Sequence, residues 1–72
     1  MLRIKDIRED KDLKQKDVAL MLNITQTNYS KYELGKINIP TEQLKKMAIL
    51  FDTSIDYLLG LTNEIKPYPR IK

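Results

Sequence analysis

Two short helix-forming segments joined by a three-residue link constrain this fold more than any other feature of the sequence. Residues 15–22 (QKDVALML) and 26–33 (QTNYSKYE) contain neither Gly nor Pro, and only residues 23–25 (NIT) separate them. Thr25 suits the N-cap of the second segment, and Gly35 suits the position just beyond its end. The sequence therefore predicts two short helices that meet at a tight corner.

The remainder of the chain also favours helices. Only two Gly and three Pro occur among the 72 residues, and no stretch alternates apolar and polar residues as a strand does. We expect an all-α domain over residues 1–61, followed by a C-terminal tail over residues 62–72. The domain would have five helices, of which the first three cover about residues 2–10, 15–22 and 26–33. The fourth would start near Pro40 and carry the core residue Phe51. The fifth would be capped by Ser54 and would end at Gly60.

The amino-acid content argues against several classes of function. The chain has no Cys and no His, so it lacks the usual transition-metal ligands and the commonest general base. Carboxylates such as Asp6, Glu9 and Asp10 crowd one helix, where a solvated charged face is the simpler interpretation. We therefore expect no enzymatic activity, no metal site and no cofactor.

The distribution of charge and apolar residues indicates a soluble, cytoplasmic protein. No apolar run approaches the roughly 20 residues needed to cross a bilayer, and the first ten residues (MLRIKDIRED) are too charged for a signal peptide. We expect no membrane association. Thirteen Lys and Arg against ten Asp and Glu give a net charge of +3, which favours an anionic partner.

The helix expected over residues 26–33 has two unlike faces. At about 100° per residue, Tyr29 and Tyr32 lie on one side and would join the core. The opposite side offers hydrogen-bond donors and acceptors, a methyl group and one cation, with no carboxylate among them. This polar face consists of Gln26, Thr27, Ser30 and Lys31.

Residues 4–60 resemble the lambda-repressor/Cro-type, or Xre-like, helix-turn-helix family. The resemblance runs in register through IKDIRED, LKQKDVALMLNITQTNYSKYELGK, NIP, LKKMAILF and SIDYLLG. It implies a five-helix DNA-binding fold with the helix-turn-helix at helices two and three, and it implies that the third helix enters the DNA major groove. Lys14 departs from the family pattern because a Ser or Thr cap is frequent there. Leu20 and Met21 stand where the family more often has charged residues.

The side chains on the polar face match the edges of DNA bases. Gln26 can pair in bidentate fashion with adenine, Thr27 can place its methyl group against that of thymine, and Lys31 can donate to guanine. Asn28, at the edge of this face, could contact a base or a phosphate. Each base contact would favour the correct base over a wrong one by about 1–3 kcal/mol of binding free energy. The alternative interpretation is a merely solvated helix face.

Contacts to DNA phosphates would supply most of the affinity. Gln15 begins the second helix, where unpaired backbone N–H groups and the helix dipole favour an anion. The resemblance implies further backbone contacts in the loop after the third helix. The expected phosphate-binding residues are Lys14, Gln15, Lys16, Ser30, Lys36 and Asn38.

Arg8 and Glu33 are charged, yet each lies next to apolar positions. The resemblance implies that they form a partly buried ion pair joining the first helix to the third. A bidentate pair would orient the third helix, although its net stabilisation can be near zero because both groups lose hydration.

A single domain of this kind contacts half of a binding site, so specificity normally requires a dimer on an inverted repeat with half-sites about 34–36 Å apart. We expect a homodimer, at least on DNA, through the fifth helix and the tail. The expected interface residues are Tyr57, Leu58, Leu61, Ile65 and Tyr68. The alternatives are core packing for the leucines and disorder for the tail.

The sequence is compatible with two functions from different classes. The first is a sequence-specific regulator of transcription that binds double-stranded DNA, as a repressor that occupies its operator. The second is a protein-interaction module, such as an antitoxin-like partner that covers another protein, with Leu20 and Met21 as its contact residues.

Overall fold

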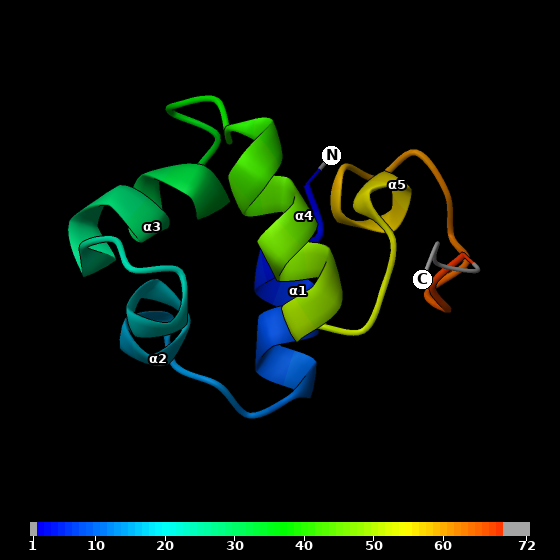
Figure 1. Cartoon of the computed structure of the whole chain (residues 1–72), viewed down its shortest axis with the longest axis horizontal. Coiled ribbons are helices and arrows are strands. Elements are labelled where there is room, and N and C mark those ends of the chain that lie inside the picture. The colour runs from blue at the N-terminus through cyan, green and yellow to red at the C-terminus, as the bar shows by residue number, and fades with distance from the viewer. Residues whose placement is uncertain (1, 69–72) are drawn as a thin grey trace.

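A computed structural model of the chain describes residues 2–68, and within that range it contains five helices and no strand (Figure 1). The all-α fold class is therefore confirmed. The helices are α1 (Ile4–Asp10), α2 (Gln15–Met21), α3 (Gln26–Glu33), α4 (Thr41–Leu50) and α5 (Ile55–Leu58). Residues 69–72 of the expected tail lie outside the described residues.

The starts of two helices differ from the expected positions. α1 begins at Ile4, two residues later than predicted, because the chain at Arg3 is not yet helical. Pro40 is the N-cap of α4 rather than its first helical residue, since its ψ of 147° is extended.

Asp17 lies in the first turn of α2, and its carboxylate accepts the backbone N–H of Lys14 at 3.0 Å. This bond stabilises the start of α2 where no Ser or Thr cap is present.

Three sharp reversals of the chain use Asp or Asn in left-handed backbone. The φ angles of Asp12, Asn23 and Asp52 are 57°, 59° and 53°. Short polar side chains tolerate this conformation better than most others, which explains their occurrence directly after α1, α2 and α4. Gly35 ends α3 in the same backbone region, at φ 70°. The links between helices can therefore be short.

The corner between α2 and α3 is fixed on both sides. The Ile24 N–H donates to the Ala19 carbonyl at 3.0 Å, and the Ile24 side chain packs against the core. Thr25 is the N-cap of α3, and its hydroxyl oxygen accepts the Asn28 N–H at 3.1 Å. These contacts set the direction in which α3 leaves the corner, and α3 begins at Gln26 as predicted.

All five helices contribute to one apolar core. Phe51, Met47 and Leu58 are at most 1% exposed, and Tyr29 of α3 is fully buried beside them. α3 and α5 lie on opposite sides of the central helices α1 and α4 (Figure 1). The polar face of α3 is therefore remote from α5 and from the part of the tail that the structure describes.

The described part of the tail returns to the surface of α5. The Thr53 hydroxyl donates to the Ile65 carbonyl at 2.5 Å, and the Tyr68 hydroxyl donates to the Asp56 carboxylate at 3.0 Å. Arg3, ahead of α1, donates to the Asn63 side chain at 2.5 Å. Residues far apart in the sequence thus hold this segment. Within residues 2–68 no helix combines the length and the apolar character needed to cross a bilayer.

Candidate nucleic-acid interface

The outer face of α3 and the start of α2 border one open groove with a volume of about 370 Å³, which we call the polar groove. Six of its lining residues were predicted from the sequence to contact DNA. Leu34 is the only lining residue, among those that the structure describes, that sequence reasoning missed. The polar groove is lined by Gln15, Gln26, Thr27, Ser30, Lys31, Leu34 and Lys36. No carboxylate is among these residues.

Two buried tyrosines hold α3 so that its polar face points outward. Tyr29 is 0% and Tyr32 is 6% exposed, and their rings meet edge to face with centroids 6.3 Å apart. Because these residues occupy the inner side of the helix, Gln26, Thr27 and Lys31 lie exposed on the other. Both tyrosines are therefore core residues and do not offer a surface for stacking bases.

Four further residues predicted to contact DNA are exposed but do not line the polar groove. Lys14 and Lys16 flank Gln15 at the start of α2, and Asn28 lies in the first turn of α3. Asn38 lines a different, largely apolar pocket together with Leu2 and other residues. The structure therefore brings the centre of the predicted site together and leaves these four residues around it.

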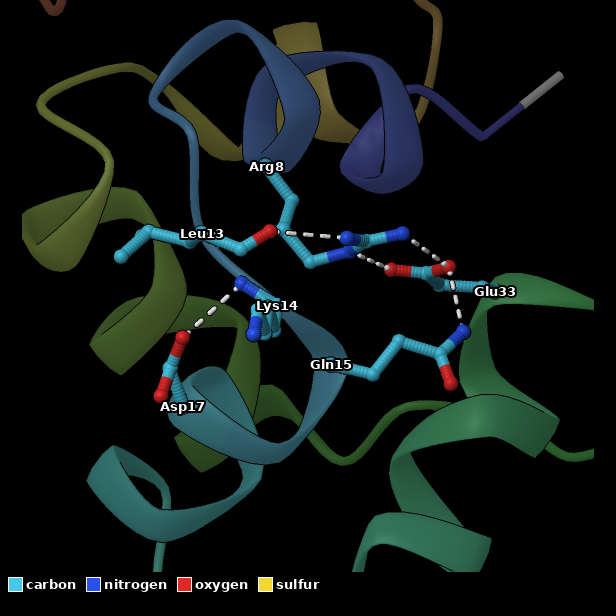
Figure 2. A network of polar contacts seen from close by, with 6 residues as sticks. All are labelled: Arg8, Leu13, Lys14, Gln15, Asp17 and Glu33. Atoms are coloured by element: carbon cyan, nitrogen blue, oxygen red, sulfur yellow. Dashed lines mark hydrogen bonds and ion pairs between the residues drawn. The ribbon is translucent and has the colours of Figure 1, made fainter.

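A buried ion pair ties α3 to α1 (Figure 2). The Arg8 guanidinium donates from Nε to Glu33 Oε2 at 2.6 Å and from Nη2 to Glu33 Oε1 at 3.2 Å. Its Nη1 donates to the Leu13 carbonyl at 2.8 Å, in the link between α1 and α2. The two side chains are only 10% and 4% exposed. The buried positive charge of Arg8 is therefore balanced by the negative charge of Glu33.

Gln15 joins the same network from α2. Its side-chain Nε2 donates to Glu33 Oε1 at 2.9 Å (Figure 2). The amide group carries a second N–H, and Gln15 also lines the polar groove. Sequence reasoning assigned Gln15 to phosphate alone and missed this bond. Three helices thus converge on the Glu33 carboxylate, which lies at the last residue of α3.

The network shifts the pKa values of its members. Burial alone would raise the pKa of Glu33, but the hydrogen bonds from Arg8 and Gln15 outweigh burial and hold that pKa below its usual value. The bond to Glu33 raises the pKa of Arg8. Burial, helped by the neighbouring Glu33 carboxylate, raises the pKa of Tyr29. At neutral pH the pair is therefore ionised and Tyr29 carries no charge.

The prediction of a dimer interface at α5 needs a correction. Leu58 is 0% exposed and Tyr57 is 8% exposed, because both side chains belong to the core of the single chain. The Arg3 guanidinium also covers the Tyr57 ring, 5.2 Å from its centroid. Neither residue can offer a surface to a second copy of the folded chain. Leu61, Ile65 and Tyr68 are exposed, by contrast.

Apolar side chains also gather on a surface apart from the polar groove. Leu20 is 81% and Met21 is 53% exposed, as a pair that contacts a protein partner would need to be. Met21 borders a groove of about 270 Å³, which we call the apolar groove, between the ends of α2 and α4. The apolar groove is lined by Met21, Leu22, Lys46, Ile49 and Leu50.

Comparisons with known proteins agree with this geometry. A family model described as helix-turn-helix matches residues 4–58. The chain is similar to three proteins of Bacillus subtilis (strain 168). It is 31% identical over 70 residues to the uncharacterized HTH-type transcriptional regulator YobD, covering 97% of this chain and 61% of YobD. The identity is 40% over 58 residues to the HTH-type transcriptional regulator ImmR, covering 81% of this chain and 46% of ImmR.

The third relative is the SPbeta prophage-derived uncharacterized HTH-type transcriptional regulator YonR. The chain is 37% identical to it over 61 residues, covering 85% of this chain and 56% of YonR. Across the three relatives, the chain spans between 46% and 61% of the relative's length. The matched region contains every helix from α1 to α5. The chain belongs to the helix-turn-helix family of the Xre, lambda-repressor-like type.

Proposed function

We propose that this chain is the DNA-binding part of a transcriptional regulator and that α3 enters the major groove of double-stranded DNA. One observation carries the proposal: six side chains suited to base edges and phosphates line one open groove that has no carboxylate. The helix-turn-helix family and the relatives described as transcriptional regulators support it. They also favour a regulator over an enzyme.

The chemistry of the polar groove supports specific readout of sequence. Gln26 and Thr27 begin α3, where their exposed side chains can approach base edges without moving the backbone. Lys31, one turn further on, lies on the same side and supplies the cation for a guanine O6 or N7. An amide, a methyl group and a cation in one row can recognise three different base edges.

The residues around this row are suited to phosphates. Lys36 and Ser30 border the polar groove, and the exposed Lys14 and Lys16 flank its Gln15 side. Each phosphate neutralised by a cation releases counterions, so affinity should fall steeply with salt concentration. Phosphate contacts on both sides of α3 would fix the position of the helix in the groove.

Two copies of the domain would be needed for a complete site. Leu61, Ile65 and Tyr68, which follow α5 in the sequence, are exposed, and we expect a second copy to cover them. A dimer of this kind would bind an inverted repeat and, as a repressor, would act by occupying an operator that polymerase must use.

Selection from a random pool of duplex DNA tests the proposal directly. The wild-type chain should enrich one sequence as an inverted repeat at near-physiological salt. The Gln26→Ala, Lys31→Ala double variant should lose that enrichment. Lys11→Ala, which removes an exposed cation outside the polar groove, is the matched control and should keep it. If the wild-type chain enriches no sequence, the proposal is wrong.

The apolar groove favours a second candidate function, a contact with another protein. Leu20, Met21 and Ile49 are all more than half exposed, and Met21 and Ile49 line the apolar groove together. Apolar surface that is exposed in one place is a mark of an interaction site. The Leu20→Ser, Met21→Ser variant should keep its affinity for the selected duplex and lose a protein that the wild-type chain retains in purification from its source cells. Loss of DNA binding would instead assign these residues to packing.

A further inference from the structure

Leu34 has an environment unlike that of the buried leucines of the chain. Its side chain is 65% exposed, and it lines the polar groove beside amide, hydroxyl and ammonium groups. It belongs neither to the core cluster nor to the partly buried apolar residues packed against that cluster. Within the described structure, core packing therefore does not explain an apolar residue at this position.

The backbone places Leu34 on the same stripe as the polar residues of α3. Leu34 is the C-cap of the helix, yet its φ of −80° and ψ of −7° remain right-handed. It follows Lys31 by three positions and Thr27 by seven, so the three side chains point to one side of the helix. Leu34 thus extends the exposed row of α3 by one turn.

An isobutyl side chain can recognise only one group on the floor of the major groove. The donors and acceptors of the base edges gain nothing from it, whereas the C5-methyl group of thymine is apolar and projects into the groove. Burying a methyl group between two apolar surfaces removes it from water on both sides. Thr27, seven positions earlier in the same row, offers a single methyl group, and Leu34 offers two.

We propose that Leu34 contacts the C5-methyl group of a thymine in each half-site and gives the protein a second thymine preference, separate from that of Thr27. The inference rests on the proposed function, because it requires α3 in the major groove. It adds a residue that determines specificity through shape and apolar contact, at the end of the row opposite to Gln26.

Removal of single methyl groups from the DNA tests the inference. In the duplex that the wild-type chain selects, each thymine of the half-site is replaced in turn by deoxyuridine, which lacks only the C5-methyl group. Fluorescence anisotropy then gives the Kd of each duplex for the wild-type chain, for Leu34→Ala and for Thr27→Ser. The Thr27→Ser variant is the matched control, because it removes a protein methyl group from the same row.

The wild-type chain should bind two of the uracil-substituted duplexes about fourfold more weakly than the thymine duplex, because each lacks one methyl group that the protein buries. Leu34→Ala should lose the sensitivity at one of these two thymines and keep it at the other. Thr27→Ser should show the reverse pattern. Unchanged melting temperatures would show that neither variant disturbs the fold.

Several results would overturn the inference. If Leu34→Ala weakens binding to every duplex by the same factor, Leu34 contacts the sugar–phosphate backbone. If Leu34→Ala keeps the wild-type sensitivity at every thymine, or if the selected half-site contains no second thymine, Leu34 reads no methyl group. Failure of the proposed function is distinguishable from these results, since the wild-type chain would then select no duplex at all.

Discussion

Arg8 of α1 and Glu33 of α3, 25 positions apart in the sequence, form a bidentate pair in which two guanidinium nitrogens face two carboxylate oxygens. The pair does not touch the exposed side of α3, yet it determines where that side points. Because Gln15 donates to the same carboxylate, the last residue of α3 is held by both preceding helices. A rigid attachment of this kind keeps the polar groove in one geometry before any ligand arrives.

We expect Glu33→Ala to lower the free energy of unfolding by about 3–5 kcal/mol, because Arg8 then remains buried without its counter-charge. Urea denaturation followed by circular dichroism measures the change. Glu9→Ala, which removes an exposed carboxylate of α1, is the matched control and should change stability little. A denaturation midpoint equal to that of the wild type would contradict a structural role for the pair.

The stability of the domain should depend on pH through Glu33. Its pKa in the folded chain lies below the ordinary value of 4.5, so the ionised carboxylate stabilises the fold at neutral pH. Glu33→Gln should therefore be less stable than the wild type at pH 7. The difference should shrink as pH falls below 4.5 and through the folded pKa, where the wild-type carboxyl group also becomes neutral. The midpoints of urea denaturation of both proteins, measured between pH 7 and pH 2, test this pH dependence. A stability difference that stays constant over that range would rule out a contribution from the ionisation of Glu33.

Lys36 and Lys31 should affect DNA binding in different ways, although both line the polar groove. Lys36→Ala should weaken binding to all sequences alike and reduce the slope of log K against log salt by about 1, as expected for one phosphate contact. Lys31→Ala should relax the preference at one base pair, worth about 1–3 kcal/mol. Titrations of selected and scrambled duplexes at several salt concentrations separate the two effects. Identical behaviour of the two variants would disprove the assigned roles.

Asn23 should be replaceable by Gly but not by Ala. Its φ of 59° is left-handed, a region that Gly enters freely and that Asn tolerates through its short polar side chain, whereas it costs Ala about 1–2 kcal/mol. Asn23→Ala should therefore lower the melting temperature, and Asn23→Gly should leave it close to the wild-type value. Thermal denaturation of both variants provides the comparison, and an equal loss in both would place the role of Asn23 in its side chain instead.

Leu61→Ser should weaken the proposed dimer without changing the polar groove. Leu61 is 72% exposed and follows α5 in the sequence, and α5 lies on the other side of the central helices from α3 (Figure 1). We expect the variant to bind an inverted repeat more weakly and with less cooperativity, and to bind a single half-site as the wild type does. Sedimentation velocity would report any loss of self-association. Unchanged affinity for the inverted repeat would exclude this surface from the dimer.

The features that followed from the sequence are those that depend on local chemistry. Thr25 was predicted to cap α3 because its side chain can reach an N–H three residues on, and it does so. Tyr29 and Tyr32 were assigned to the core from helical periodicity alone, and both are buried.

The features that sequence reasoning missed depend on contacts between distant segments or on where a helix stops. Gln15 donates to a carboxylate 18 positions away, which no local pattern indicates. The burial of Leu58, which the sequence left open as the alternative to a dimer contact, reflects the packing of α5 on the core and an Arg3 N–H that donates to the Leu58 carbonyl. Leu34 was overlooked because the helical pattern was ended at Glu33, whereas its backbone continues the turn. Extending the helical pattern by one residue, to the C-cap, would have placed Leu34 on the polar side of α3.

The separation between the two sides of α3 bears on how such a domain can evolve. Within the described structure, the side chains of Gln26, Thr27 and Lys31 make no hydrogen bond to the rest of the chain, whereas Tyr29, Tyr32 and Glu33 hold the helix in place. Mutations in the first group therefore escape the purifying selection that maintains folding. A duplicated gene could drift toward a new target sequence at these positions while its product stays folded at every step.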